Sequence, residues 1–415
     1  MSRDISMSAS RSHSTCYKLS ATHPGVGAVL VPDTDEACGN QITASSAADI
    51  AALAGCSTFT GSLTVLGLSA INSIALPALQ SLTGTIKIAS NPHLTSLSLD
   101  NLQSSTGTIT LYNNTLLSVV NVPQLKTLNS LEIVTAPSLR QLSLANVQII
   151  NSFKVEDTGL DNSGIVPWSS FQKATDIGIS NNKFLKAIDI PGLNTISGKL
   201  IVAANGLLEG KGEGASLHLS NLTTVSNCTL RHLTDIQLPS LTSVSSSLSF
   251  DETNLQLIQA PHLKTVGQTL SIVSNNNLSN ISFSELTSIG GALLIANNTL
   301  LTSVNGFGQL KDISGVLNMR GDFSNVSFPK VSSVQGGMSV LSSSKDFDCS
   351  TLSKVKASAR GKTICQAQVK SAKPTNSNGG EDDALLNSSN VLKVTTQGAV
   401  WAAVVLLSGL ASYAI

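Results

Sequence analysis

The chain has 415 residues, enough for two or three ordinary domains, so chain length does not limit the size of its hydrophobic core. It carries 25 basic and 25 acidic residues, and only 12% of its residues are charged, which argues against nucleic-acid binding because phosphates demand a basic excess. Aromatic residues make up 4%, and Ser, Thr and Asn supply most of the polar surface, a composition typical of extracellular proteins.

Residues 1–37 precede the repetitive part of the chain and do not read as a standard secretory leader. Their only apolar run, Gly25–Val31, is short and late for the hydrophobic region of a signal peptide. We expect residues 1–37 to be an atypical leader or to lie before the true start of the protein, with Cys16 outside the mature fold.

Two close pairs of cysteines bracket the repeats. Cys38 and Cys56 precede them, Cys349 and Cys365 follow them, and neither pair has the CxxC spacing of a zinc site. We expect one disulfide at each end and an oxidising compartment; the alternative is four reduced thiols in the core. Stacked repeats need caps at their open ends, and the segment between the first two cysteines carries Ala, Ile and Leu at helical spacing.

Between the cysteine pairs the sequence repeats with steps of 20 to 28 residues. Each repeat opens with a segment whose second and fourth positions are apolar and whose third position is mostly polar. This alternation predicts a strand with one buried face. Thirteen segments share the pattern, and they begin at Ser62, Thr85, Thr108, Ser130, Ser152, Asp176, Lys199, Asn227, Ser247, Thr269, Ala292, Val316 and Gly337.

Each repeat continues with two further short apolar pieces, so that a coil has three short strands. Asn, Pro and Gly mark the bends between them, and the side-chain amide of a corner Asn can bond the same Asn one coil further on. The sequence therefore predicts an all-β, right-handed parallel β-solenoid of the leucine-rich-repeat kind, with about 13 coils stacked about 4.8 Å apart.

One step of 28 residues contains a Gly-rich excursion, Gly206–Leu219. It favours a division into a first lobe with the N-terminal cap, residues 38–207, and a second lobe with the C-terminal cap, residues 208–366. The alternative is a surface loop on one continuous stack.

The last 17 residues, from Ala399, are nearly all apolar and carry no charge. A spanning helix needs about 20 residues and usually a basic flank. A signal for a glycosylphosphatidylinositol (GPI) anchor fits better, because small residues, a polar spacer and an apolar tail follow one another here. We expect attachment at Asn387, with Ser388 as second choice, a linker over 367–387 and a propeptide over 388–415; a simple tail anchor is the alternative.

Seven further Asn-x-Ser/Thr sequons are candidates for N-glycosylation if the chain is secreted. They are Asn113, Asn221, Asn227, Asn277, Asn280, Asn297 and Asn325.

No catalytic, metal or cofactor site is expected. The paired carboxylates of polysaccharide cleavage do not occur at matching positions of adjacent repeats, and no P-loop, G-x-S-x-G or H-E-x-x-H motif is present. The one charged cluster places Arg231 opposite Asp251 and His232 opposite Glu252, and we interpret it as a ladder of ion pairs on a solvated face.

Several single residues have structural interpretations. Cys228 falls on a buried strand position and is interpreted as a packed free thiol. His93, His218 and His262 share no metal-ligand spacing. The two aromatic residues considered as platforms for sugar rings, Tyr112 and Trp168, are interpreted as packing or loop residues.

The caps, the repeats and the tail together resemble a fungal family. The segments that carry the resemblance are CGNQITASSAADIAALAGCSTFTGSLTV, GTIKIASNPHLTSLSL, TLSIVSNNNLSNISF, the FDCSTL cap and the apolar tail. They are similar to GPI-anchored cell-wall organisation proteins of the extracellular-mutant and sporulation-specific type, whose repeats are similar to receptor L domains. The resemblance covers Cys38–Ile415, although the chain shows no recognisable signal peptide and no long Ser/Thr-rich linker.

This resemblance implies a glycoprotein of the outer leaflet of the plasma membrane and the cell wall, required for wall organisation and integrity and without enzymatic activity. It implies cap roles for Cys38, Cys56, Cys349 and Cys365 and anchor attachment at Asn387. The expected partners are wall polysaccharide (glucan, chitin) or wall glycoproteins and the membrane, through the GPI lipid. The alternatives are a receptor-like ectodomain that binds a specific protein or glycan ligand between two lobes and, less favoured, a polysaccharide-active β-helix enzyme.

Overall fold

The residues that the computed structural model describes fall in the ranges 17–20, 29–32, 38–144, 147–162, 168–206 and 214–372. The chain divides into two compact units, Met1–Pro374 and Thr375–Ile415, and the second unit lies outside the described residues. The predicted anchor site Asn387 and propeptide therefore lie outside them too. In the part that is described, no helix combines the length and the apolar character of a membrane span.

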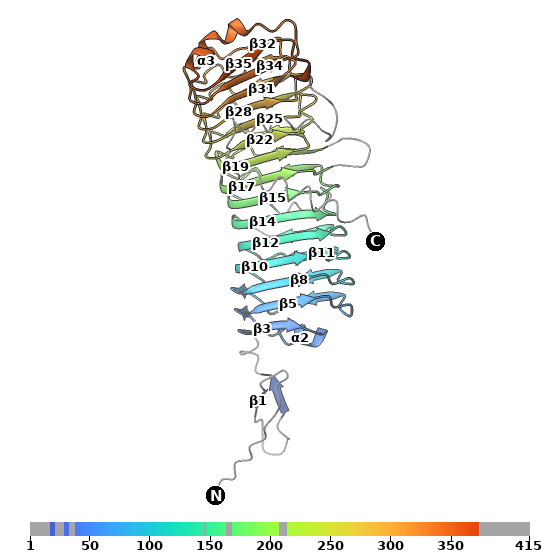
Figure 1. Ribbon diagram of the computed structural model, residues 1–415. Coiled ribbons are helices and arrows are strands. Elements are labelled where there is room, and N and C mark those ends of the chain that lie inside the picture. The colour runs from blue at the N-terminus through green and yellow to red at the C-terminus, as the bar shows by residue number, and fades with distance from the viewer. Residues whose placement is uncertain are drawn as a thin grey trace. The chain divides into compact units, whose positions relative to one another are not determined.

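A long parallel sheet dominates residues 38–372 (Figure 1). Each strand of this sheet, which we call the long sheet, pairs with the strands one coil before and one coil after it. All thirteen predicted strands are present, and one further strand lies in each cap, so fifteen strands make fourteen coil steps where the sequence predicts about 13 coils. The strands are β3 (Gln41–Ala44), β5 (Ser62–Leu66), β8 (Thr85–Ala89), β10 (Ser104–Tyr112), β12 (Thr127–Ala136), β14 (Ile149–Thr158), β15 (Lys173–Ser180), β17 (Thr195–Ala203), β19 (Thr224–Arg231), β22 (Leu248–Asp251), β25 (Leu270–Val273), β28 (Leu293–Ala296), β31 (Leu317–Gly321), β34 (Met338–Ser342) and β35 (Thr363–Gln366).

Two further ladders of short strands complete each coil, as the sequence predicts. One ladder comes before the long sheet within each coil. In the middle of the stack it has no separate strands, and the first residues of the longer strands of the long sheet, from β10 to β19, take their place in the ladder. Its separate members are β4 (Thr58–Phe59), β7 (Ser81–Leu82), β21 (Ser243–Val244), β24 (Thr265–Val266), β27 (Ser288–Ile289), β30 (Asp312–Ile313) and β33 (Ser333–Val334).

The other ladder follows the long sheet and forms what we call the second face. It is divided into four short parallel sheets. Its strands are β6 (Ser73–Ala75), β9 (Ser96–Ser98), β11 (Val119–Val122) and β13 (Gln141–Leu144); β16 (Ala187–Asp189), β18 (Ala215–His218) and β20 (Leu233–Gln237); β23 (Leu257–Gln259) and β26 (Asn280–Ser282); and β29 (Ser303–Val304) and β32 (Asn325–Val326). Apart from the solenoid strands, β1 (Tyr17–Ser20) and β2 (Val29–Pro32) pair antiparallel.

Both predicted disulfides are present, one in each cap. Cys38 is bonded to Cys56 and Cys349 to Cys365. Within the described ranges, helical structure occurs only in the caps and at residues 370–372: α2 (Ala47–Ala51), η1 (Cys349–Leu352), α3 (Ser353–Ser358) and η2 (Lys370–Ala372).

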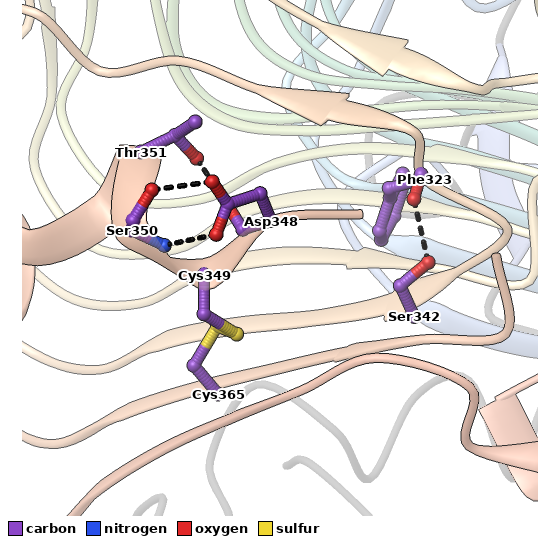
Figure 2. Close-up of a disulfide and its surroundings, with 7 residues drawn as sticks. All are labelled: Phe323, Ser342, Asp348, Cys349, Ser350, Thr351 and Cys365. Atoms are coloured by element: carbon purple, nitrogen blue, oxygen red, sulfur yellow. Dashed lines mark hydrogen bonds between the residues drawn. A yellow bond between two sulfur atoms is a disulfide. The ribbon is translucent and has the colours of Figure 1, made fainter. Parts of the chain in front are cut away.

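Each cap has a local hydrogen-bonding device at the start of its helix. In the first cap the Asp49 carboxylate accepts from the backbone N–H groups of Ser45 and Ser46, which fixes the start of the helix. In the second, Asp348 accepts from the backbone N–H of Ser350 at 2.8 Å beside the disulfide (Figure 2). These hydrogen bonds lower the pKa of both carboxyl groups.

The core is a column of aliphatic side chains from the inward positions of every coil. The second and fourth positions of the thirteen predicted segments are all buried, from Leu63 and Val65 to Met338 and Val340. Each position pairs with its equivalent in the next coil, so every layer covers the one before it. Towards the C-terminal end the aliphatic layers give way to stacked rings: Phe283, Phe307 and Phe328 lie with centroids 5.4 and 5.6 Å apart.

The corner after each long-sheet strand has a distinct backbone geometry. The first residue of most corners adopts a positive φ, as at Ser90, Asn113 and Asn297. The next residue turns inward, and where two successive coils both have Asn there, the first amide bonds the second; Asn91 donates from Nδ2 to Oδ1 of Asn114 at 3.1 Å. The predicted asparagine ladder is therefore confirmed, and it satisfies backbone groups that the corner leaves without sheet partners.

The long sheet continues across the 28-residue step. Strands β17 and β19 pair in parallel from Thr195 to Ala203, with a register shift between Ile196 and Lys199. Of the Gly-rich excursion, residues 207–213 lie outside the described residues, and Ala215–His218 forms β18 of the second face.

Candidate functional site

The outer face of the long sheet is the largest regular surface on the solenoid. It is formed mainly by the first, third and fifth positions of the thirteen predicted segments, counted from the starting residues given in the sequence analysis, which alternate with the buried second and fourth positions. The third positions are aligned one per coil, and most carry a hydroxyl, an amide or a charge. From β5 to β34 they are Thr64, Lys87, Thr110, Glu132, Lys154, Gly178, Ile201, Thr229, Ser249, Ser271, Leu294, Asn318 and Ser339.

One ion-pair cluster lies on this face near the first third of the stack. The ammonium of Lys154 is 3.2 Å from Glu132 and 3.1 Å from Glu156. Burial alone would lower the pKa of Lys154, but the charge of Glu156 and hydrogen bonds to both carboxylates outweigh it and raise that pKa. The lysine thus bridges the two carboxylates and offsets one of their two negative charges, so the cluster keeps a net charge of −1.

The cluster predicted at mid-chain exists, with one change of partner. Arg231 lies opposite Asp251 in the sheet register, as expected, but its guanidinium bonds Glu252 at 2.6 Å. The His232 ring nitrogen Nε2 bonds the same carboxylate at 2.8 Å, as predicted. The change arises because His232 and Glu252 both occupy the positive-φ corner, where the backbone directs their side chains back over the end of the strand.

The two carboxyl groups of this cluster have pKa values shifted in opposite directions. Hydrogen bonds from His232 and then from Arg231 lower the pKa of Glu252 to about 2 against the opposing effect of burial. Burial raises the pKa of Asp251, although Ser249 donates a hydrogen bond to it at 2.5 Å. Glu252 is held by two cationic groups and is poorly placed to act as a general base.

A second cluster, which sequence reasoning missed, lies on the second face. His218 of β18 lies between Asp189 of β16 and Asp235 of β20, with Nδ1 2.6 Å from one carboxylate and Nε2 2.8 Å from the other. At least one ring nitrogen donates to a carboxylate, and both can donate when each carries a proton. Aligning the second-face segments instead of the long-sheet segments would have revealed it.

Cys228 and Trp168 are packed in the core as expected, whereas Tyr112, expected to be a packing or loop residue, is an exposed strand residue. Cys228 is completely buried, and burial raises its pKa to about 12, as expected for a packed thiol. Trp168 is buried and packs edge-on against Phe153, with ring centroids 6.0 Å apart. Tyr112 is 51% exposed at the end of β10. Among the described residues, no group of three or more His, Cys, Asp or Glu side chains could hold a metal ion.

The seven sequons are unevenly distributed over the surface. Asn227 lies in β19 of the long sheet, and the other six lie outside the long-sheet strands, at corners or on the second face. All seven asparagines are exposed or half-buried. Glycosylation at these positions remains a prediction, and Asn387 lies outside the described residues.

The fold and its surface define a non-globular repeat protein, a capped parallel β-solenoid with a long polar face. No family model matches the chain. It is 31% identical over 257 residues to sporulation-specific protein 2 of Saccharomyces cerevisiae, covering 61% of this chain and 49% of that one. It is 33% identical to a cell surface GPI-anchored protein of Arthroderma benhamiae (50% and 52% covered) and 27% identical to protein ecm33 of Aspergillus fumigatus (57% and 57%).

These matches confirm the resemblance found in the sequence: the chain is related to the fungal Ecm33 family of cell-surface proteins. It spans about half the length of these relatives. A leucine-rich repeat protein from Bacteroides ovatus covers 76% of this chain and 86% of its own at 12% identity, with a TM-score of 0.25.

Proposed function

We propose that this protein is a non-enzymatic, GPI-anchored glycoprotein of the fungal cell surface and cell wall. It contributes to the organisation and integrity of the wall. It does so by binding wall polysaccharide or wall glycoproteins through the outer face of its long sheet. The names of its relatives support the location at the cell surface and in the wall. The contact surface is inferred from this chain's own geometry.

The observation that carries the proposal is the contrast between the two sides of the coil. The outer face of the long sheet presents one third-position side chain per coil, mostly Ser, Thr, Asn or Lys, over the whole stack. Six of the seven described sequons lie elsewhere. Glycans at those positions would cover the corners and the second face and leave the long sheet accessible.

The spacing of this face suits a polymer. Neighbouring strands of a sheet lie about 4.8 Å apart. A sugar unit in an extended β-linked chain advances by a similar distance, so hydroxyls on successive sugars can meet hydrogen-bonding side chains on successive coils. The small aromatic content of the face favours many weak polar contacts over a few stacked rings.

The test is sedimentation of the purified full chain with insoluble chitin and with β-1,3-glucan, in the absence of other proteins. We expect retention on at least one of them and a loss of about tenfold in affinity for the double variant Thr110→Arg, Ser271→Arg, which places long side chains over the third-position column. Ser98→Arg on β9 of the second face is the matched control and should bind like the unmodified chain. Retention that needs a soluble protein partner would favour the receptor-like alternative.

The continuity of the long sheet bears on that alternative. Strand pairing runs across the 28-residue step, so the described residues offer no open seam in this sheet for a ligand between two lobes. The anchor is tested separately. Release of the protein from membranes by a phosphatidylinositol-specific phospholipase, with Asn387 as the last residue of the mature chain, is the expected result; an intact C-terminal tail would refute the anchor.

A further inference from the structure

The pentapeptide Asn-Asn-Thr-Leu-Leu occurs twice, at 113–117 and 297–301, and both copies occupy the same corner of the coil, directly after β10 and β28. The first asparagine of each copy has a positive φ, 51° at Asn113 and 55° at Asn297. Each donates from Nδ2 to the hydroxyl of a serine one coil earlier, Ser90 at 3.2 Å and Ser274 at 3.1 Å. The two corners are therefore built alike.

The fold accounts for the second and fifth positions of the motif and leaves the fourth unexplained. Asn114 and Asn298 are buried members of the asparagine ladder, and the fifth-position leucines are completely buried. The fourth-position leucines are not: Leu116 is 48% exposed and Leu300 is 56% exposed.

A third corner supplies an internal comparison. Residues 181–185 read Asn-Asn-Lys-Phe-Leu, so the apolar fourth position is kept but Lys183 replaces the threonine that makes a sequon. Here the ring of Phe184 is half-buried, with the Arg140 guanidinium 4.3 Å and the Lys183 ammonium 5.3 Å from its centroid. Where the corner has no sequon, the chain's own charged side chains cover the apolar group.

The other described sequons have no exposed apolar side chain at this fourth position, although Leu257, which is 38% exposed, pairs with Asn280 across the strands. The residues three positions after their asparagines are either polar or buried. In chain order they are Thr224, Leu230, Asn280, Phe283 and Phe328.

We propose that Asn113 and Asn297 carry N-linked oligosaccharides and that Leu116 and Leu300 are packing sites for the first N-acetylglucosamine of each. In the attachment step the asparagine Nδ2 forms a bond to C1 of that sugar and the bond from C1 to the pyrophosphate of the lipid-linked donor breaks. The lipid pyrophosphate leaves and Nδ2 loses one proton. The N–H that remains can still donate to the serine hydroxyl of the preceding coil.

The packing step follows from the surfaces involved. N-acetylglucosamine has an apolar ring face and an acetyl methyl group, and covering an exposed leucine with them removes apolar area from water. The fixed left-handed corner holds the attachment point in place, which reduces the entropy lost when the sugar settles. Tyr112 precedes Asn113, whereas Ala296 precedes Asn297, so the first site offers a larger apolar wall.

The test uses the full chain secreted from a fungal host. Peptide mapping should find both asparagines occupied. Each site is then measured alone, in the Asn297→Gln or the Asn113→Gln background, by comparing Tm for three forms of the chain. These are the intact glycoprotein, the glycoprotein trimmed to one N-acetylglucosamine by an endoglycosidase, and the chain made without its glycan by blocking N-glycosylation in the host, which keeps the asparagine that an amidase would convert to aspartate. We expect trimming to leave Tm unchanged and complete absence of the glycan to lower it by roughly 2 °C, more at Asn113 than at Asn297.

Leu116→Ser should abolish the decrease in Tm that accompanies loss of the glycan at Asn113, and Leu300→Ser should do the same at Asn297. The matched control is Ile149→Ser, because Ile149 is 65% exposed but adjoins no sequon, and it should leave the shift intact. An unoccupied Asn113 or Asn297, an unchanged Tm in the complete absence of the glycan, or a shift that persists in the leucine variants would overturn the proposal. None of these outcomes affects the polysaccharide-binding test, because the two surfaces differ.

Discussion

Asn182 donates from Nδ2 to Oδ1 of Asn205 at 2.9 Å, and both side chains are completely buried although they lie in different coils. Asn182 also accepts from the backbone N–H of Thr158 at 3.1 Å, so one amide joins three consecutive coils. The solenoid thus has a polar seam inside its corner, parallel to the aliphatic core. A buried amide of this kind stabilises only while every partner is satisfied.

The first prediction concerns this seam. Asn182→Leu keeps the branched shape of the side chain but leaves the Thr158 N–H and the Val155 carbonyl oxygen without the Asn182 amide as partner, and we expect a loss of about 3 kcal/mol in the free energy of unfolding. Urea denaturation measures it. The neighbouring Asn181→Gly is the control, because glycine accepts the positive φ of that exposed corner, and its effect should stay within about 1 kcal/mol. Equal effects of the two changes would show that the seam contributes little.

A second prediction concerns the tight bend before the long sheet. A Cβ at Gly84 would lie 1.7 Å from the carbonyl oxygen of Gly61, a backbone atom one coil away that cannot move without disturbing the ladder. We expect Gly84→Ala to destabilise the fold by about 3 kcal/mol. Gly308→Ala is the matched control, because nothing lies within 4 Å of its added Cβ. Thermal unfolding of the two variants distinguishes them; a Tm for Gly84→Ala within a degree of the control would contradict the close approach.

The third prediction is a pH dependence at the mid-chain cluster. The pKa of Glu252 falls from its ordinary 4.5 to about 2, so the ion pairs with Arg231 and His232 contribute fully above pH 4.5 and lose their contribution as pH drops towards 2. Because the side chain is half exposed and solvent screens the charges, we expect Glu252→Gln to cost about 1 kcal/mol at pH 6. At pH 2, where Glu252 is about half protonated in the folded chain, most of the difference in unfolding midpoint between the variant and the unmodified chain should have disappeared.

Asp251→Asn is the companion variant, and we expect it to change the stability of the fold in the opposite direction. Burial raises the pKa of Asp251, so its ionised form destabilises the fold near neutral pH and that penalty disappears as the group is protonated. The neutral amide should therefore raise Tm at pH 7 and leave it unchanged at pH 3. A lower Tm at pH 7 would mean that the attraction of Arg231 outweighs burial.

The fourth prediction concerns the C-terminal cap. Replacing Cys349 and Cys365 by serine opens the loop that carries α3 and joins it to β35. A disulfide across a loop of this length is worth about 3 kcal/mol, so the double variant should unfold at a lower temperature. Hydrogen exchange should speed up first in β35, the last strand of the sheet. Uniform exchange over all strands would instead indicate that the cap does not protect the end of the stack.

Much of the fold follows from local pattern. Apolar residues alternate with polar ones at Leu63 and Val65 and in twelve further segments, so only one face of each strand can be buried in the core. Because the segments are nearly equally spaced, equivalent residues of successive coils pair with one another. The strands in the caps, Gln41–Ala44 and Thr363–Gln366, could not be predicted in the same way. Each has a neighbour on one side only, so its sequence is under less pressure to alternate.

The charged contacts show where pattern reasoning ends. Register placed Arg231 opposite Asp251 correctly, yet the guanidinium reaches Glu252, because a left-handed corner rather than a strand directs that carboxylate. The contact of His218 with Asp189 and Asp235 was missed, because the 28-residue step and the 20-residue step that follows it break the spacing that would have aligned them.

By itself, the sequence determined the stacked parallel strands, the inward side chains and the cysteine pairs, since each depends on a period or a spacing that a single chain displays. Only the tertiary structure decided which charged groups meet and which apolar side chains stay bare. Leu116 and Phe184 occupy equivalent corners, and what separates them is whether Arg140, which lies two coils before Phe184, covers the side chain. Such a contact depends on the reach and direction of side chains from different coils.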